Sequence, residues 1–263
     1  MNTNIYYFSG TGNSLSIAKK IKNKTENSQL ISIPSAMEEK SNFEEEIIGI
    51  VSPIYMYNIP YMVVDFIKKI KKAKYVFFIF SGAGQAGNGI KVVKNLFSSQ
   101  NIKLNALFNI AMPNNYTPYG YVKENTQKKL FKKADKRIEE IIDIVVNKKE
   151  FFDKNKTGFF KSNIFPGILY KLAYNRVNIL DKNFFVDSNC NGCSTCEKVC
   201  PVSNITMQDN KPKWNNNCEQ CYACIQWCSK CSIQINKKTI GVKRYHHPEI
   251  TLKEIIKSSK NNH

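Results

Sequence analysis

The sequence predicts an α/β domain with a doubly wound, five-stranded parallel sheet, followed by a small cysteine-rich unit. Two observations lead to this prediction. Short apolar segments alternate with helical patterns through residues 1–148, and all nine cysteines fall within residues 190–231. So sharp a change of composition marks a boundary between two units with different chemistry.

Five segments rich in Ile, Val, Phe and Tyr have the composition of buried strands: residues 5–8, 29–33, 47–51, 75–80 and 104–111. Between them, apolar residues at three- and four-residue spacing predict helices at residues 14–24, 61–72, 89–98 and 127–148. The acidic segment 34–46 predicts a short helix at most. Such alternation requires crossover connections, so the strands are expected to be parallel, with ligands at their carboxyl ends.

Composition narrows the class of protein. Of 263 residues, 42% are hydrophobic and 23% are charged, which is typical of a globular chain. The net charge of +18 is spread over many polar stretches without a recognised binding motif, so we expect no nucleic-acid partner. The chain opens without a signal peptide, and polar residues and prolines interrupt its most apolar window, residues 47–67. We therefore expect a cytoplasmic protein without a transmembrane segment.

The first strand-to-helix loop, residues 9–14, offers hydroxyls, glycines and helix N-terminal amides, a combination suited to a phosphate group. It contains no Lys or Arg, whereas a P-loop nucleotide site requires Gly-Lys-Ser/Thr. A dinucleotide site requires a third glycine where Leu15 stands. Both of these sites are disfavoured. The remaining alternative is a turn that caps a helix and binds nothing.

This loop resembles the phosphate loop of flavodoxins, which reads Ser/Thr-x-Thr-Gly-x-Ser/Thr and binds the phosphate of FMN without a basic residue. Ser9, Thr11, Gly12 and Ser14 fill the pattern, and Asn13 stands at its variable position. The resemblance implies FMN as a cofactor.

Two further loops resemble the flavodoxin loops that contact the flavin ring. Residues 52–60 carry tyrosines that could stack on the ring, although one of them could belong to the core instead. Residues 81–88 lack the acidic and aromatic residues usual in flavodoxins, which would leave one face of the flavin open. The implied ring-contacting residues are Pro53, Tyr55, Tyr57, Ser81, Gly82 and Gly84.

The cysteines follow C-x2-C-x2-C-x3-C at residues 190–200, and the same spacing returns 28 positions later, at residues 218–228. An odd count in tight clusters disfavours a disulfide scaffold, and zinc ribbons use paired knuckles instead. The pattern resembles bacterial ferredoxins, small α+β domains that hold two [4Fe-4S] clusters. In these domains the fourth cysteine of each motif ligates the other cluster. The resemblance therefore implies one cluster on Cys190, Cys193, Cys196 and Cys228 and a second on Cys218, Cys221, Cys224 and Cys200.

Cys231 is left over and aligns with Ser203 in the repeat, which indicates a small buried residue rather than a ligand. The connector before the motifs is basic and aromatic. A helix predicted at residues 166–178 would pack between the two domains or, as the alternative, lie on a membrane surface. The basic tail is expected to carry a short helix at residues 248–257, with His246 and His247 in solvent.

The whole chain resembles a family from anaerobic bacteria in which a flavodoxin-like domain is fused to a C-terminal two-cluster ferredoxin. The likeness includes residues 8–14, 52–55 and 112–116 and the eight spaced cysteines. It divides the chain into a flavodoxin-like domain (1–148), a connector (149–185), a ferredoxin domain (186–236) and a tail (237–263). The implied function is electron transfer, as an oxidoreductase or carrier whose partner is a redox protein or a small-molecule electron acceptor. The alternative is a ferredoxin-type carrier whose flavodoxin-like domain has lost FMN and docks a partner.

Overall fold

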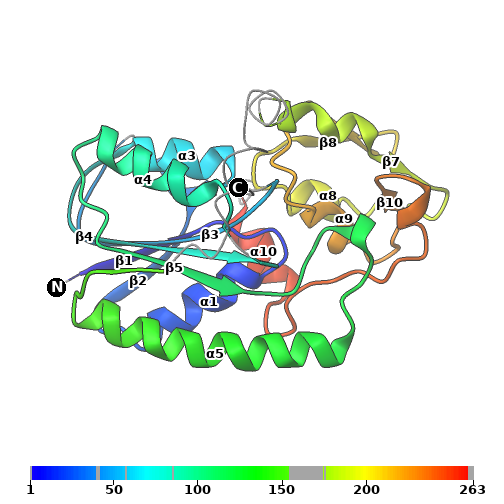
Figure 1. The fold of residues 1–263 in the computed structure, drawn as a ribbon. Helices are drawn as coiled ribbons and strands as arrows, with labels where there is room; N and C mark the ends of the chain where they lie inside the picture. The colour runs from blue at the N-terminus through cyan, green and yellow to red at the C-terminus, as the bar shows by residue number, and fades with distance from the viewer. Residues whose placement is uncertain are drawn as a thin grey trace.

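The computed structural model describes residues 2–39, 42–56, 58–84, 86–153, 174 and 176–259. The larger part is a parallel sheet with helices on both faces. The cysteine-rich unit lies beside the carboxyl ends of the strands, on the right in Figure 1.

The sheet has six parallel strands in the order β2-β1-β3-β4-β5-β6. They are β1 (Thr3–Tyr7), β2 (Ser28–Ser32), β3 (Phe43–Pro53), β4 (Ile70–Gly82), β5 (Ala106–Ala111) and β6 (Phe151–Phe152). The predicted parallel α/β architecture is confirmed, but the predicted number of five strands is wrong. Phe151 and Phe152, expected in the connector, pair with Ala106 and Leu107. A strand of two residues is too short to show periodicity, and the sheet recruits it because the Phe151 ring stacks on Phe108 at 5.3 Å.

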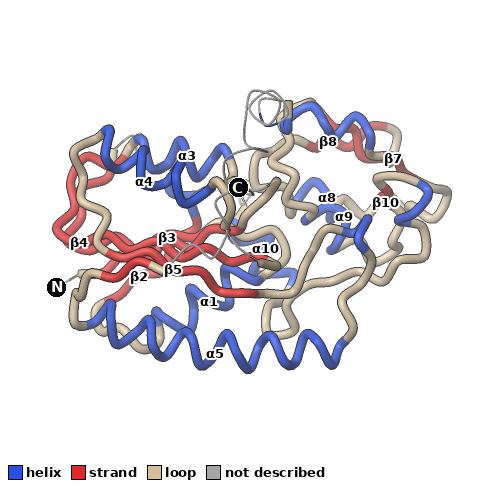
Figure 2. Tube along the Cα trace, viewed as in Figure 1, coloured by secondary structure: helices blue, strands red, loops and turns tan. Residues whose placement is uncertain are grey.

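Helices cover both faces of the sheet, with α1 (Asn13–Lys22) and α5 (Glu124–Val146) on one face and α3 (Tyr61–Lys68) and α4 (Gly89–Ser99) on the other (Figures 1 and 2). These are the four predicted helices. The short helix α2 (Ile33–Glu39) and the 3-10 turn η1 (Thr117–Tyr119) complete the domain. Within the described ranges, no helix combines the length and the apolar character needed to cross a bilayer.

The sheet core is tightly packed because both of its faces are covered. The central strands β3 and β4 carry charged residues in their first halves, but their second halves, from Ile47 and from Tyr75 onward, are mainly apolar and buried, as expected for a sheet covered on both sides. Gly49 in β3 pairs with Phe77 in β4, and a Cβ atom at Gly49 would lie only 2.1 Å from Cζ of the Phe77 ring. The glycine therefore provides the space that this aromatic ring occupies.

The cysteine-rich unit contains two short helices and two antiparallel ribbons. Its helices are α8 (Thr195–Lys198) and α9 (Ala223–Gln226), and its ribbons pair β8 (Ile205–Gln208) with β9 (Lys211–Trp214) and β7 (Phe185–Val186) with β10 (Ile233–Gln234). The 3-10 turns η2 (Val177–Asn183) and η3 (Lys237–Thr239) flank the unit. The helix predicted at residues 166–178 falls mostly outside the described residues.

Part of the C-terminal tail is packed rather than solvated, so the expectation of a solvated side chain holds for His246 and is wrong for His247. The His247 side chain is 2% exposed and its ring lies 4.7 Å from that of Phe131. His246 is exposed but stacks on Trp227 at 4.2 Å. The tail ends in α10 (Leu252–Ser258), which starts later than predicted. Its basic composition concealed the apolar anchors Ile250 and Ile255, which are 3% and 1% exposed.

Replacing Gly49 with alanine should destabilise the sheet, because the added methyl group overlaps the buried Phe77 ring. Overpacking of this kind costs about 1–3 kcal/mol in the free energy of unfolding, which chemical denaturation measures. The matched control is Gly84→Ala, where nothing lies within 4 Å of the added Cβ atom. Phe77→Leu should relieve part of the penalty in the double variant; an additive double variant would contradict this account of Gly49.

Acid should loosen the tail through His247. Burial lowers the pKa of this histidine from 6.5 to about 4, with nearby Lys20 and His246 lowering it and Glu249 and Asp135 opposing the shift. The unfolded chain therefore takes up this proton first as the pH falls. The stability that depends on neutral His247 is complete above about pH 6.5 and is lost as the pH falls through about 4.

The measurement compares the free energy of unfolding at pH 7 and pH 4.5 in the wild type and in His247→Leu. The wild type should lose on the order of 2–3 kcal/mol more than the variant, because the other acid-sensitive groups are common to both proteins. The control is His246→Leu, which removes the exposed neighbouring histidine. Its loss of stability between the two pH values should be closer to that of the wild type than the loss in His247→Leu is. Equal losses in wild type and His247→Leu would contradict the prediction.

Candidate functional site

The loop between β1 and α1 presents a partly free helix N-terminus. Gly12 is the N-cap of α1, with a left-handed backbone at φ 96° and no side chain to cap the helix. The Ser9 hydroxyl accepts a hydrogen bond from the Leu15 amide at 3.4 Å. Among the described residues, no acceptor contacts the backbone N–H groups of Thr11, Asn13 or Ser14. These amides stand at the positive end of the helix, where an anion is favoured.

Polar side chains from three loops converge beside these amides. The Ser14 hydroxyl lies 2.7 Å from that of Ser81, at the end of β4. The Thr11 hydroxyl accepts a hydrogen bond from Asn115 at 3.2 Å, and the Ser9 hydroxyl accepts one from the Gly12 amide at 3.1 Å. The Thr11 and Ser14 hydroxyls can still act as donors to a bound anion.

The loops enclose a cavity of about 80 Å³, and the structure brings most of the predicted flavin-site residues together around it. Gly12 lies outside the cavity and contacts the tail, Gly84 is exposed in its loop, and Tyr57 is outside the described residues. The predicted residues that line the cavity are Ser9, Thr11, Asn13, Ser14, Pro53, Tyr55, Ser81 and Gly82.

The size of the cavity limits what it can hold. At about 80 Å³ it is smaller than the roughly 300–1,000 Å³ of whole-ligand pockets, and it suits a group of the size of a phosphate. A larger hollow of about 410 Å³ lies between η2 and the β8–β9 ribbon, but it includes none of the predicted site residues. The chemistry of the donors favours the smaller cavity as the binding site.

Tyr55 is buried rather than free to stack on a ring. Its side chain is 8% exposed, and its hydroxyl bonds to the backbone of Gly10. Burial raises the pKa of Tyr55 well above its usual value, and the nearby thiol of Cys221 raises it further. Tyr55 therefore belongs to the core, as expected for one of the two tyrosines in this loop.

The cysteine-rich unit lies directly on the loop. A Cβ atom at Gly10 would stand 2.6 Å from the backbone oxygen of Cys221, so only glycine permits this approach. The Trp227 indole donates a hydrogen bond to the Gly10 carbonyl at 3.0 Å, and Asn115 donates to the Cys221 carbonyl at 3.4 Å. The loop and the second cysteine motif therefore form one continuous structure.

The 28-residue repeat of the sequence is also present in the backbone. Left-handed residues recur at equivalent places in both halves, and two of them, Ser194 and Tyr222, are the N-caps of α8 and α9. Cys231 has the same left-handed conformation as Ser203, its counterpart, with φ 50° at both. The remaining pair is Gly192 with Gln220.

The fourth cysteine of each motif lies near cysteines of the other motif. Burial raises the pKa of Cys224 well above its usual value, and the neighbouring thiols of Cys218, Cys221, Cys200 and Cys196 raise it further. Burial likewise raises the pKa of Cys196 to about 12, with smaller contributions from Cys228 and Cys193. The two motifs therefore bring their thiols together in one region of the unit.

Backbone amides point at the sulfur atoms. The Gln220 amide donates to Cys218 Sγ at 3.3 Å, and the Asn204 amide donates to Cys200 Sγ at 3.2 Å. Such amides stabilise thiolate ligands. Within the described residues, no three His, Cys, Asp or Glu side chains are arranged around the position of a single metal ion. A four-iron cluster spreads its thiolates over four irons, so it requires wider spacing than one ion does.

Glu219 makes a contact between the two units that the sequence did not reveal. Its carboxylate accepts hydrogen bonds from the Tyr61 and Met62 amides at 2.8 and 2.7 Å, capping α3 from the other unit. The side chain is 6% exposed, and burial raises its pKa to about 7. Its position inside a cysteine motif gave no signal of this role, because the partner lies more than 150 residues away.

Comparison with known proteins identifies the larger domain. Residues 4–140, just over half of the chain, match the family model described as flavodoxin domain. No curated protein matches the chain. Among solved structures, the chain is similar to two-electron reduced flavodoxin from Megasphaera elsdenii, with 19% identity over 51% of this chain and 98% of that one and a TM-score of 0.34.

Two other solved structures show similar coverage. A flavoprotein in complex with FMN from Lactobacillus acidophilus NCFM has 15% identity over 41% of this chain and 92% of that one, with a TM-score of 0.31. An azoreductase from Bacillus anthracis has 8% identity over 56% of this chain and 100% of that one, with a TM-score of 0.38. The assignment depends on the family match and on the strand order, and by these the chain belongs to the flavodoxin domain family.

Proposed function

We propose that the chain is an electron-transfer iron-sulfur flavoprotein that exchanges electrons between FMN in the flavodoxin domain and two [4Fe-4S] clusters. The clusters would be held by a ferredoxin-type domain at residues 186–236. When bound, FMN can exchange one or two electrons while each cluster passes one, so the fusion would join a two-electron donor or acceptor to one-electron carriers. The terminal partner would be a redox protein or a small-molecule electron acceptor.

One observation carries this proposal. The backbone of Cys221, in the second cysteine motif, touches Gly10 in the phosphate loop. Two unrelated carriers joined by a linker would have no need for such proximity. Here a glycine, an indole hydrogen bond and the Asn115 amide all maintain it, which supports a shared function for the two sites.

The loop residues fit the phosphate end of FMN. Unpaired amides of Thr11, Asn13 and Ser14, together with two hydroxyls, supply donors to a charged group without any basic side chain. Each hydrogen bond to a charged group contributes about 1.5–3 kcal/mol. The flavin ring would lie outside the small cavity, against the loops that begin at Pro53 and Gly82.

The cysteines fit two clusters with exchanged fourth ligands. Cys190, Cys193, Cys196 and Cys228 would hold the first cluster, and Cys218, Cys221, Cys224 and Cys200 the second. The proximity of Cys200 to Cys224 and of Cys228 to Cys196 supports the exchange of the fourth ligands. Thiolates suit the soft iron of such clusters.

Exposure differs between the two proposed ligand sets, which supports a direction of access. In the first set Cys193 is exposed and only Cys196 is buried, whereas three of the four cysteines in the second set are buried. A redox partner would therefore approach the first set. The second set would be shielded from water by the flavodoxin domain, against which Cys221 lies.

A second candidate function is a ferredoxin-type carrier whose flavodoxin-like domain does not bind FMN. The small volume of the cavity, about 80 Å³, is the observation that favours it. Anaerobic purification followed by flavin, iron and sulfide analysis separates the two candidates. Iron and sulfide without bound flavin, and no micromolar affinity for added FMN, would favour the carrier.

The cluster assignment predicts about eight irons per chain. Cys200→Ala should chiefly remove the cluster of Cys218, Cys221 and Cys224, because the fourth ligands are exchanged. Cys228→Ala should remove the other cluster. Cys231→Ala is the matched control and should retain both. Iron analysis and electron paramagnetic resonance of the anaerobic proteins measure the outcome; zinc, or four irons in the wild type, would contradict it.

Electron exchange is predicted to occur within one molecule. After anaerobic rapid mixing with a reductant of the clusters, the flavin should be reduced at a rate independent of protein concentration, because contacts such as Trp227 to Gly10 fix the two units together. Trp227→Phe removes that hydrogen bond and should slow the exchange by about 2- to 10-fold.

The control is Phe152→Leu, at an aromatic residue that is 40% exposed in the edge strand β6, away from the phosphate loop and the cysteines. It should leave the rate unchanged. A wild-type rate proportional to protein concentration would mean that the domains exchange electrons by collision and would refute the prediction.

A further inference from the structure

The C-terminal tail crosses the outer side of the phosphate loop. The His247 amide donates a hydrogen bond to the Thr11 carbonyl at 2.8 Å. A Cβ atom at Gly12 would lie 3.0 Å from the Cβ atoms of both His247 and Ile250, in addition to the strain of its positive φ. The loop is therefore held between the cavity on one side and the tail on the other.

Tyr245 fixes the first residue of α1. Its hydroxyl donates a hydrogen bond to Asn13 Oδ1 at 2.6 Å, and Asn13 Nδ2 donates to the Pro113 carbonyl at 3.0 Å. Both ends of the Asn13 amide are thus occupied by protein groups. Tyr245 is 3% exposed, and burial raises the pKa of its phenol, so the hydroxyl keeps its proton and remains a donor.

The position of Tyr245 is itself fixed by the cysteine-rich unit. Its backbone amide donates to Gln226 Oε1 at 2.7 Å, and Gln226 belongs to α9, between two of the cysteines. The same glutamine donates to the Thr117 hydroxyl at 3.0 Å. A continuous set of hydrogen bonds therefore runs from α9 through Tyr245 to Asn13.

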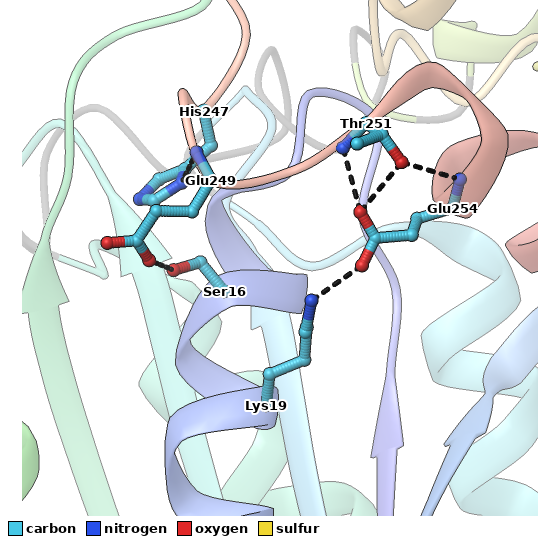
Figure 3. Close-up of polar contacts among 6 residues, drawn as sticks. All are labelled: Ser16, Lys19, His247, Glu249, Thr251 and Glu254. Carbon is cyan, nitrogen blue, oxygen red and sulfur yellow. Dashed lines mark hydrogen bonds and ion pairs between the residues drawn. The ribbon is translucent and has the colours of Figure 1, made fainter.

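The rest of the tail is anchored on α1, as Figure 3 shows. Thr251 and Glu254 form a capping box at the start of α10, and Glu254 also pairs with Lys19 at 2.5 Å. Glu249 accepts a hydrogen bond from Ser16 at 3.4 Å. Exposed pairs of this kind contribute little individually. The buried Ile250 and Ile255 supply most of the anchoring.

We propose that Tyr245 is a positioning residue that holds the N-terminal turn of α1 ready for the phosphate of a flavin nucleotide. This inference rests on the proposed function. A turn that is already ordered loses less conformational freedom when the phosphate binds, so the affinity is higher. The effect is transmitted through the Asn13 side chain and concerns the phosphate alone, because Tyr245 does not line the cavity.

The test measures the dissociation constants of FMN and riboflavin by quenching of flavin fluorescence. Tyr245→Phe keeps the aromatic ring and removes only the hydroxyl. This variant should weaken the affinity for FMN by about 2- to 13-fold, which corresponds to the loss of one ordinary hydrogen bond. Riboflavin has no phosphate, so its affinity should not change. Tyr119→Phe, at a tyrosine that is 79% exposed, is the matched control and should bind both flavins as the wild type does.

A second variant tests the route through Asn13. Asn13→Ala should also weaken the binding of FMN and leave the binding of riboflavin unchanged. Adding Tyr245→Phe to this variant should cause no further loss of FMN affinity, because the two residues act through one hydrogen bond. Iron content and circular dichroism verify that each variant is folded; if Tyr245→Phe does not fold, the affinities of Asn13→Ala decide.

The outcomes separate this inference from the proposed function. A wild type that binds neither flavin would overturn the proposed function, and the inference with it. If the wild type binds FMN but Tyr245→Phe binds it equally well, or loses both flavins to the same extent, only the positioning role of Tyr245 is overturned.

Discussion

The close approach of Gly10 to Cys221 is the constraint on which the rest of the structure depends. It allows the Trp227 indole to reach the Gly10 carbonyl and Asn115 to bridge the Thr11 hydroxyl and the Cys221 carbonyl. Any side chain at position 10 would have to displace backbone rather than a flexible side chain. The geometry of the phosphate loop and the geometry of the second cysteine motif therefore depend on each other.

Buried polar groups make the contact between the two units specific. Apolar surfaces alone would tolerate many relative positions, because the hydrophobic effect has no direction. The Glu219 carboxylate, by contrast, is satisfied only where the two free amides at the start of α3 meet it. A different packing of the two units that kept this acid buried would leave it without donors, at a cost of about 1–3 kcal/mol or more for a charged group.

The C-terminal tail also makes specific polar contacts, on the side of the loop that faces away from the cavity. It contributes little to the core of the sheet. Its backbone and the Tyr245 hydroxyl nevertheless form hydrogen bonds with the two residues that flank Gly12. The loop thus receives hydrogen bonds from Asn115 after β5, from the cysteine-rich unit and from the C-terminal tail. The proposed phosphate site has no basic residue and would depend on such ordering, because its affinity would come from fixed dipoles rather than from a mobile charge.

The sequence by itself determined the parallel α/β domain, its four main helices, the phosphate loop and the cysteine spacing, because each is encoded by residues close together in the chain. It did not determine the two-residue strand β6, the burial of His247, or the use of Tyr245 and Glu219 by the other domain. These features depend on pairs such as Trp227 with Gly10 and Tyr245 with Asn13, which are 217 and 232 positions apart. Local periodicity contains no information on such pairs, so only the packing of the two units in three dimensions could decide them.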